Sequence, residues 1–405
     1  MREVSGQAVI CFSNIEWGIW KQRHHHLMER FARANSVLFV ETVGMRAPNL
    51  MSVGDLRRIA GRLRRAAGRA LGRGGGGSRP ASLPRGLRVH SPLVVPFHDS
   101  AAWRRVNSGL LLRDLRRWLA DEGLENPILW VYLPLHLILD VAEQLPHRLL
   151  VYDCVDAITE FRDAPASLVD SEARLLRRAD LVLASSRPLL ERCAALHPGA
   201  IYVPNAGEVE RFASESTRRP EPPDLRAIPH PRVGYVGAIR EWFDADLVRQ
   251  AAERFPQASF VLVGDDTPVL ASLRRLANVH ALGPRAYEDL PAYLGAMDVC
   301  IIPFRQTALI RHTHPIKVYE YLAAGRAVVS TPMAEIRHLT EVDQADAGEP
   351  FLAALGARLV EPRSPAAEAR RRASIQGETW DARFRVVEAA VRDRLALSRP
   401  QAAEA

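Results

Sequence analysis

The segment HTHPIKVYEYLAAGRAVVST, residues 312–331, carries the signals of a short helix followed by a buried strand. Pro315 suits the first turn of a helix, where its missing N–H is not needed, and Thr313 can cap that end. Gly325 suits the C-terminal cap, and the apolar run AVVS after it is typical of a buried strand. We therefore predict a helix over residues 315–324 that leads into a strand of a parallel sheet.

The same alternation of apolar strands and helical stretches runs through the 405-residue chain in two blocks. The first block begins at QAVICFS (7–13) and ends at AIYVPN (200–205), and the pattern restarts at RVGYVGAI (232–239). Near-continuous apolar strands separated by helices indicate parallel sheets that are covered on both faces. We predict an α/β protein of two doubly wound, Rossmann-like parallel-sheet domains that face each other across a cleft. Ligands of such sheets bind outside the carboxyl ends of the strands.

Breaks in this pattern set the predicted domain boundaries. Residues 214–231 hold five prolines and several charges, which is typical of a linker. We predict an N-terminal domain, this linker, a C-terminal domain and a terminal helix that packs back on the N-terminal domain, over residues 1–213, 214–231, 232–377 and 378–396 respectively.

The composition is that of an ordinary globular protein, with an apolar fraction of 47% and a charged fraction of 25%. The sequence shows no apolar run that could span a bilayer, and its N-terminus lacks the features of a signal peptide. The four cysteines have no metal-binding spacing and are expected to be buried free thiols in a reducing cytosol. We expect a cytoplasmic protein, with peripheral attachment to the inner face of the cell membrane as an alternative.

The net charge of +7 favours an anionic partner. Much of the excess lies in residues 56–79, which contain eight arginines and no acid, with apolar residues at helical spacing between them. This basic amphipathic pattern predicts contact with an anionic membrane surface, and the alternative is a mobile, arginine-rich loop. Nucleic acid is not expected as a partner, because the arginines lie next to apolar residues and form no aromatic and basic platform.

Lys317 stands out because the chain has only two lysines among its 54 basic residues. In the first turn of the predicted helix, its ammonium, the free backbone N–H groups and the positive end of the helix dipole converge. This arrangement predicts an anion site, and a compact ammonium suits a diphosphate. Glu320 lies on the same helix face, where its carboxylate can accept hydrogen bonds from ribose hydroxyls. The alternative is a plain Lys–Glu pair on the surface of the helix.

Several motifs together resemble those of GT-B glycosyltransferases of a group-1-like bacterial branch. HPIKVYEYLAAGRAVVST resembles the nucleotide-binding helix, and VGYVGAI followed by Trp242, Phe243 and Asp244 resembles the start of the C-terminal domain. LGPRAYEDLPAYLGAMDVCIIPF resembles the base-binding loop, helix and strand of that domain. SNIEWGIWKQRHH, VYDCVDAITEF, LASSRPLL and YVPNAGEVERF resemble segments of the N-terminal half. Within the branch, the chain is similar to teichuronic-acid and exopolysaccharide transferases and to the xanthan-type glucuronosyltransferase.

This resemblance implies a nucleotide-diphosphate sugar as donor substrate, with no cofactor and no metal. It implies that Lys317 binds the diphosphate, that Glu320 binds the ribose, and that Gly237 lets its loop approach the phosphates. A glycine at position 237 also fits a plain turn at the end of a strand. The full set implied for the nucleotide-sugar site is Gly237, Arg240, Gly283, Arg285, His312, His314, Lys317, Tyr319 and Glu320.

One position departs from the pattern of the family. The wider group-1 family has a second glutamate eight positions before the ribose-binding one, and His312 stands there in this chain. The sugar contact of that glutamate is therefore not carried over. We expect His312 or His314 to lie near the phosphates instead, where either can hydrogen bond an oxygen.

Glycosyl transfer needs a base that deprotonates the acceptor hydroxyl. Asp153 and Asp156 follow a strand of the N-terminal half, and we favour Asp156 because it lies further past the strand; the alternative for both is strand-end capping. The three consecutive histidines 24–26 diverge on a helix, so no metal site is expected there. The acceptor side is expected to contain Trp17, Arg23, His24 and Asn205, although Asn205 also fits a buried turn.

The sequence therefore predicts a hexosyltransferase-type glycosyltransferase of cell-envelope or exopolysaccharide biosynthesis. Its partners would be a nucleotide-sugar donor and a glycan, lipid-linked or small-molecule acceptor. Two alternatives stay open: transfer to a soluble natural-product acceptor, and a non-catalytic nucleotide-sugar-binding protein of the same fold.

Overall fold

The computed structural model describes residues 3–18, 21–41, 83–92, 94, 100–160 and 167–397, so the basic segment 56–79 lies outside the described residues. The chain divides into two compact units. The N-terminal unit comprises Met1–Val203 together with Phe384–Ala405, and the C-terminal unit comprises Pro204–Arg383.

The N-terminal unit is built on a seven-stranded sheet in the order β3-β2-β1-β4-β5-β6-β7, and every pairing is parallel. The strands are nearly all apolar and buried, as expected for a sheet covered on both faces. They are β1 (Ala8–Phe12), β2 (Ser36–Val40), β3 (Leu87–His90), β4 (Ile128–Val131), β5 (Leu149–Cys154), β6 (Leu181–Ala184) and β7 (Ile201–Tyr202).

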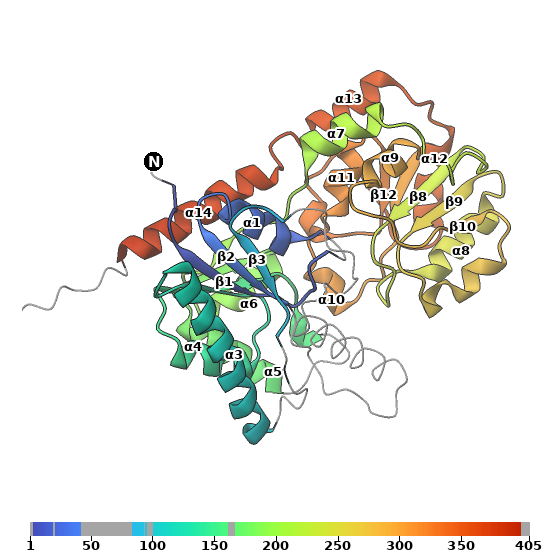
Figure 1. The fold of residues 1–405 in the computed structure, drawn as a ribbon. Helices are drawn as coiled ribbons and strands as arrows, with labels where there is room; N and C mark the ends of the chain where they lie inside the picture. Colours follow the sequence, from blue (N-terminus) through green and yellow to red (C-terminus); the bar gives the residue numbers. More distant parts are fainter. Residues whose placement is uncertain are drawn as a thin grey trace, which may run out of the picture. The chain divides into compact units, whose positions relative to one another are not determined.

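Helices cover both faces of this sheet (Figure 1). On one face, α3, α4 and α5 pack side by side. On the other face, Phe31 of α1 contacts Trp130 of β4 and also Phe384 of α14, so the C-terminal helix is part of the N-terminal unit. The described helices of this unit are α1 (Arg23–Phe31), α3 (Ala101–Glu122), α4 (His136–Gln144), α5 (Ser167–Arg178), α6 (Arg187–Ala194) and α14 (Trp380–Leu397), whose first residues belong to the other unit.

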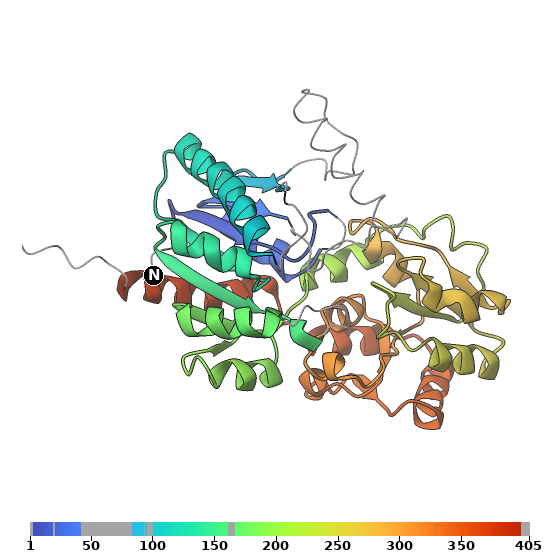
Figure 2. The same cartoon turned by 90° about the horizontal axis from the view of Figure 1, so that it is seen from below.

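The C-terminal unit, coloured from light green to orange-red in Figure 2, has a six-stranded sheet in the order β10-β9-β8-β11-β12-β13, again parallel throughout. Its strands are β8 (Arg232–Val236), β9 (Ser259–Val263), β10 (Val279–Ala281), β11 (Val299–Ile302), β12 (Ala327–Ser330) and β13 (Val342–Gln344). Its helices are α7 (Val209–Arg218), α8 (Ala245–Arg254), α9 (Leu290–Gly295), α10 (Ala308–Arg311), α11 (Lys317–Ala323), α12 (Glu349–Val360) and α13 (Pro365–Ala373). The predicted α/β class with two parallel-sheet units is confirmed.

The strand orders fix where a ligand is expected in each unit. The direction of winding reverses between β1 and β4 in the first sheet and between β8 and β11 in the second. At such a switch point the loops after the two strands part, and the crevice outside their carboxyl ends is the usual ligand site of an open α/β sheet.

The predicted linker over 214–231 is wrong at its N-terminal end. The C-terminal unit begins at Pro204, and α7 extends into the residues assigned to the linker. This helix packs on α9 and α11. Its close approach to α9 is possible because Gly295 lacks a side chain: a Cβ there would overlap the carbonyl of Ser216. Prolines after α7 suggested a break in structure, but the amphipathic helix before them belongs to the second core.

The four cysteines are free and buried, as expected. No helix in the described part of the chain is both long enough and apolar enough to cross a membrane.

Candidate functional site

The helix predicted over 315–324 is α11, which begins at Lys317 and runs for seven residues. The prediction that Thr313 caps it is wrong, because the Thr313 hydroxyl donates back to the carbonyl of Leu309, at 2.9 Å, in the preceding turn. Gly325 ends the helix as predicted. It has a φ of 78°, which favours glycine, and its N–H donates to the carbonyl of Leu322 at 2.9 Å.

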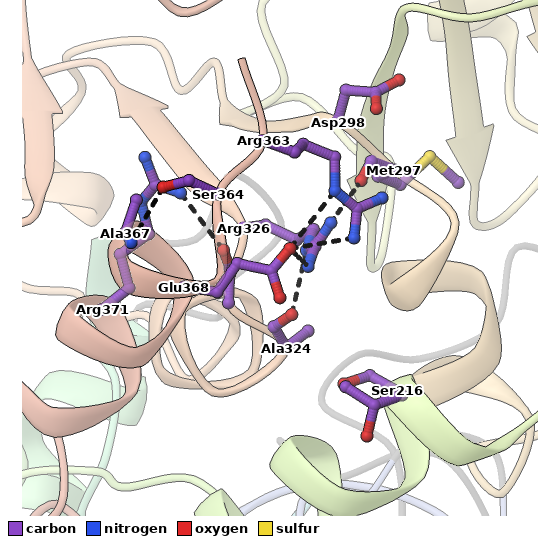
Figure 3. Close-up of polar contacts among 12 residues, drawn as sticks. Ser216, Met297, Asp298, Ala324, Arg326, Arg363, Ser364, Ala367, Glu368 and Arg371 are labelled. Carbon is purple, nitrogen blue, oxygen red and sulfur yellow. Dashed lines mark hydrogen bonds and ion pairs between the residues drawn. The ribbon is translucent and has the colours of Figure 1, made fainter. Parts of the chain in front are cut away.

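Arginines hold the C-terminal end of α11 (Figure 3). The buried Arg326 donates to the carbonyl of Ala324 and pairs with Glu368 of α13 at 2.7 Å. Arg372 of α13 donates to the carbonyl of Ala323, and Arg371 donates to that of Gly325. These contacts satisfy the carbonyls that a helix leaves open at its end, and they anchor a short helix that could not hold its position by itself.

Lys317 projects toward the switch point between β8 and β11. Its Nζ lies 5.2 Å from the ring centre of Tyr235 in β8 and 4.7 Å from that of Phe304, two residues after β11. Lys317 makes no hydrogen bond and no ion pair with any side chain of the described ranges. Aromatic faces stabilise an ammonium without neutralising its charge, so this cation stays able to bind an anion.

Burial lowers the pKa of Lys317 to about 8, and the nearby Glu320 carboxylate opposes this shift. The ammonium is thus desolvated by the surrounding protein and only partly compensated. An anionic ligand at this place would restore the lost electrostatic stabilisation.

Gly237 allows the loop after β8 to pass close to Lys317. Its φ is 145°, its N–H donates to the carbonyl of Val263 at 2.9 Å, and a Cβ would lie 2.9 Å from Lys317 Cε. Gly264, after β9, has no room for a Cβ beside the Gly237 carbonyl, and its N–H donates to Gly283 after β10. Three glycines thus bring three strand ends together, and Gly237 leaves the space that the lysine side chain needs.

Glu320 lies on the next turn of α11 and is almost fully buried. Its Oε1 accepts a hydrogen bond from the Tyr287 hydroxyl at 3.0 Å. Burial raises the pKa of Glu320 to about 7, a shift that the Tyr287 hydrogen bond and the charge of Lys317 oppose and that Glu208 reinforces. Tyr287 is itself fixed by Phe212, in an edge-on ring contact, and by the guanidinium of Arg211 over its ring.

The remaining residues predicted for the nucleotide-sugar site divide into two groups. Arg240 and Arg285 already carry partners: Arg240 pairs with Asp265 at 2.6 Å, and Arg285 pairs with Asp224 at 2.7 Å. The arginine charges are therefore compensated, unlike that of Lys317.

The second group lies along the chain that enters α11. His312 Nδ1 bonds the carbonyl of Ala308 at 2.7 Å. His314 is buried, and its ring stacks on Tyr319, whose hydroxyl lies 3.3 Å from His314 Nε2. Asn205 was expected on the acceptor side, but it belongs to the C-terminal unit and donates from Nδ2 to the His314 carbonyl at 2.8 Å. These residues support the approach to α11.

Asp153 in the N-terminal unit is fully buried at the end of β5. Both of its carboxylate oxygens lie 3.0 Å from Nε of Arg23, the first residue of α1, and Arg23 also donates to the carbonyl of Val203 at 2.7 Å. An aspartate held in a buried ion pair is a poor proton acceptor, so the geometry does not favour Asp153 as a base.

Asp156 differs from Asp153 both in its burial and in its polar partners. It is half-buried, and its carboxylate has no hydrogen bond or ion pair to any residue that the structure describes. Burial raises the pKa of Asp156 to about 6. A carboxylate with a pKa close to neutrality is suited to accept a proton.

His24 and Trp17 pack against other rings of the N-terminal unit. The His24 ring packs against that of Tyr132, which follows β4, in a tilted arrangement with 3.6 Å between ring centres. Burial lowers the pKa of His24 well below its usual value, so its ring is neutral. Trp17 is half-buried against Phe39 and His25. No group of three or more His, Cys, Asp or Glu side chains in the described ranges could hold a metal ion.

Sequence reasoning missed the aromatic residues around Lys317 and Glu320. Tyr235, Phe304 and Tyr287 were parts of quoted motifs, but the text of a motif does not tell which ring faces which ligand group. A signal was present for Phe304, since an aromatic residue just past an apolar strand lies at the carboxyl edge of the sheet.

Comparisons with known proteins agree with this geometry. Residues 230–371 match the family model described as "Glycosyl transferases group 1". The solved structures that resemble the chain include sucrose-phosphate synthase from Thermosynechococcus elongatus, with a TM-score of 0.67 and 14% identity, covering 97% of this chain and 100% of that one. The protein has the GT-B fold, and its residues 230–371 match the group 1 glycosyl transferase model, which confirms the resemblance predicted from the motifs.

Two further similar proteins are a relative found by sequence and a second solved structure. TuaH of Bacillus subtilis (strain 168), provisionally assigned as a glycosyltransferase of teichuronic acid biosynthesis, is 26% identical over 262 residues. This match spans 59% of the chain and 65% of TuaH, which is less than two thirds of that relative. The Alr3699/HepE protein of Anabaena, solved in complex with UDP-glucose, has a TM-score of 0.63 and 14% identity, covering 96% of this chain and 100% of that one.

Proposed function

We propose that the protein transfers a sugar from a nucleotide-diphosphate sugar to an acceptor used in cell-envelope or exopolysaccharide assembly. The observation that supports this most is Lys317, a desolvated ammonium held over two aromatic rings at the switch point of the C-terminal sheet. The likeness to TuaH supports an envelope polymer as the product, and the UDP-glucose complex of Alr3699/HepE supports a nucleotide sugar as the donor.

In the proposed reaction, Lys317 binds the diphosphate and stabilises the negative charge that grows on it as the sugar leaves. The ionised carboxylate of Glu320 accepts hydrogen bonds from the ribose hydroxyls, and Tyr287 orients that carboxylate. Backbone around residues 282–285 faces the nucleobase. Together these groups bind the donor and fix its reacting carbon.

Asp156 acts as the general base in this proposal. It removes the proton from the acceptor hydroxyl, whose oxygen forms a bond to the sugar carbon while the bond from that carbon to the diphosphate oxygen breaks. The proton remains on Asp156, and the nucleoside diphosphate leaves with the electron pair of the broken bond. An unpaired carboxylate with a raised pKa favours an enzyme over a binding protein that lacks turnover.

The proposal includes a metal-independent reaction, a cytoplasmic location, and an acceptor that is a glycan, a lipid-linked sugar or a small molecule. A panel of nucleoside diphosphates and nucleotide sugars, tested by thermal shift and then by donor turnover with and without EDTA, tests the donor site and the metal independence. We expect one nucleotide series to raise the melting temperature and turnover to survive EDTA. Absence of any stabilisation would contradict the donor site, and binding without turnover over a broad acceptor set would favour a binding protein.

A further inference from the structure

The position of the Asp156 carboxylate depends on the turn that carries it, because the carboxylate itself has no hydrogen bond or ion pair to any described residue. This turn joins the end of β5 to a short 3₁₀-helix, η1 (Ile158–Glu160). Within it, the N–H of Ile158 donates to the carbonyl of Asp156 at 2.9 Å. A general base must lie within hydrogen-bond reach of the hydroxyl that it deprotonates, so the groups that hold this turn affect turnover.

The chain before Asp156 is held by Ser185, which directly follows β6 and is fully buried. The N–H of Ser185 donates to the carbonyl of Cys154 at 3.0 Å, and its hydroxyl donates to the carbonyl of Val155 at 2.9 Å. These bonds continue the pairing of β5 with β6 beyond the last strand residues. The backbone is thus fixed by the sheet as far as Val155.

The chain after Asp156 is held by Arg192 of α6. Nη1 of Arg192 donates to Oγ1 of Thr159, in η1, at 3.0 Å. Nη2 of Arg192 lies 2.5 and 2.6 Å from the two carboxylate oxygens of Glu172 in α5. Glu172 is buried and also accepts a hydrogen bond from the Tyr152 hydroxyl of β5 at 2.6 Å. A guanidinium is planar and its donors are rigidly spaced, so pairing one nitrogen with Glu172 directs another at Thr159.

The charge of Arg192 is used within this network and does not disturb the proposed base. Burial disfavours the charged form of Arg192, but the Glu172 carboxylate more than offsets this, and the pKa of Arg192 is raised above its usual value. The raised pKa of Asp156 is caused by burial. A guanidinium that is neutralised by its own carboxylate can therefore hold the turn while Asp156 stays basic.

We propose that Arg192 is a positioning residue for the transfer reaction: paired with Glu172, it fixes the turn of Asp156 through the Thr159 hydroxyl. The inference rests on the proposed role of Asp156 as the general base. Arg192 and Glu172 would act on turnover through another residue, without contact with a substrate. Because the network joins β5, α5, α6 and η1, it ties the place of the base to the packing of two helices on the N-terminal sheet.

Thr159→Val is the mildest test, because it removes the hydroxyl and leaves the pair of Arg192 with Glu172 intact. The assay is release of nucleoside diphosphate from the nucleotide sugar that the thermal-shift panel identifies, over the same acceptor set. We expect kcat to fall by about tenfold to a hundredfold, since a displacement of about 1 Å at a reacting group costs up to about 10²-fold in rate. The KM for the donor should stay unchanged. Thr159→Ser, which keeps the hydroxyl, should retain a kcat close to that of the wild-type protein.

The arginine is tested with a double variant. Arg192→Met alone would leave Glu172 buried without its ion pair and is expected to destabilise the unit. Combined with Glu172→Gln, whose amide oxygen can still accept from Tyr152, it should lower kcat as much as Thr159→Val and leave the donor KM unchanged. The matched control is Arg178→Met, at the end of α5 that leads into β6, where Arg178 pairs with Glu143. It should leave kcat unchanged.

Three results would overturn the inference. In Thr159→Val, a wild-type kcat would show that the burial of Ala157 and Ile158 is enough to hold the turn. Equal losses in Thr159→Ser and Thr159→Val would show that the hydroxyl is not the contact that matters. A loss in Arg178→Met as large as that in the double variant would point to a general effect of losing an ion pair.

Asp156→Asn, measured beside these variants, separates this inference from the proposed function. Wild-type turnover in Asp156→Asn would remove the base and the inference with it, as would a wild-type protein that binds the donor without turnover. A large loss in Asp156→Asn beside a wild-type kcat in Thr159→Val would overturn the inference and leave the base in place.

Discussion

Each unit places a basic residue at the start of a helix near the end of a strand, and the two residues have opposite surroundings. Arg23 begins α1 and is buried in an ion pair with Asp153. Lys317 begins α11 and lies over the rings of Tyr235 and Phe304, with no ion pair among the described residues. The comparison teaches that a desolvated cation is structural where a carboxylate pairs with it directly and is available for a ligand where aromatic faces support it without an ion pair.

Two carboxylates of the N-terminal unit, one at the end of β5 and one just after it, show the same contrast. Asp153 is neutralised by Arg23, whereas Asp156, three residues later, is unpaired within the described residues and has a raised pKa. In the two comparisons, the residues without an ion pair are Lys317 and Asp156. These are the residues that we propose to bind the diphosphate and to act as the base.

The largest expected effect is on turnover. Asp156→Asn should lower the rate of sugar transfer by about 10²–10⁴-fold, because the acceptor hydroxyl loses its base, while nucleotide affinity is retained. Donor consumption under saturating nucleotide sugar measures this. Turnover close to the wild-type rate would remove Asp156 from the mechanism.

Arg23→Met should affect stability instead. It leaves the Asp153 carboxylate buried without a partner, which is expected to cost about 3–5 kcal/mol of unfolding free energy in a denaturant titration. Adding Asp153→Leu to this variant should recover much of the loss, because no unpaired charge then remains. Unchanged stability in the single variant would contradict the structural role of this pair.

Tyr287→Phe tests whether the hydrogen bond from Tyr287 to Glu320 contributes to nucleotide binding. Loss of one hydrogen bond to a buried carboxylate should weaken nucleotide affinity by a few fold, corresponding to about 1 kcal/mol. The pKa of Glu320 should also rise in the variant, because the hydrogen bond from the Tyr287 hydroxyl lowers this pKa in the wild-type protein. Affinity measured against pH detects both effects, and an unaltered pH profile would show that Tyr287 does not act through Glu320.

The smallest effect is a change with pH in the wild-type protein. The pKa of Lys317 is about 8, so its ammonium is present below that pH, and nucleotide affinity should fall as the pH rises above it. Glu320 and Asp156 have pKa values of about 7 and about 6, so affinity and then turnover should fall as the pH decreases through those values. A bell-shaped profile with its maximum between about pH 7 and 8 is expected, and a flat profile would contradict these assignments.

Much of the fold followed from the sequence because buried parallel strands are continuous apolar runs and their helices are amphipathic. The motifs also pointed to Lys317, Glu320 and Asp156 as site residues, and these assignments stay predictions. The partners of these residues could not be derived, since Lys317 meets a ring from a strand 82 residues earlier in the chain, and such contacts depend on packing. The surroundings of Asn205 could not be derived for a similar reason: it follows the last strand of one sheet but is hydrogen bonded within the other unit.

Calorimetry with UDP and with uridine tests the central claim most directly, using the only two lysines of the chain as a matched pair. Lys21 pairs with Glu29 at 2.9 Å and has no role in the proposed site. We predict that Lys317→Met weakens UDP binding by about tenfold or more and leaves uridine binding unchanged, since only UDP carries the diphosphate, while Lys21→Met changes neither. Equal losses for UDP and uridine in Lys317→Met, or no loss for UDP, would contradict the account.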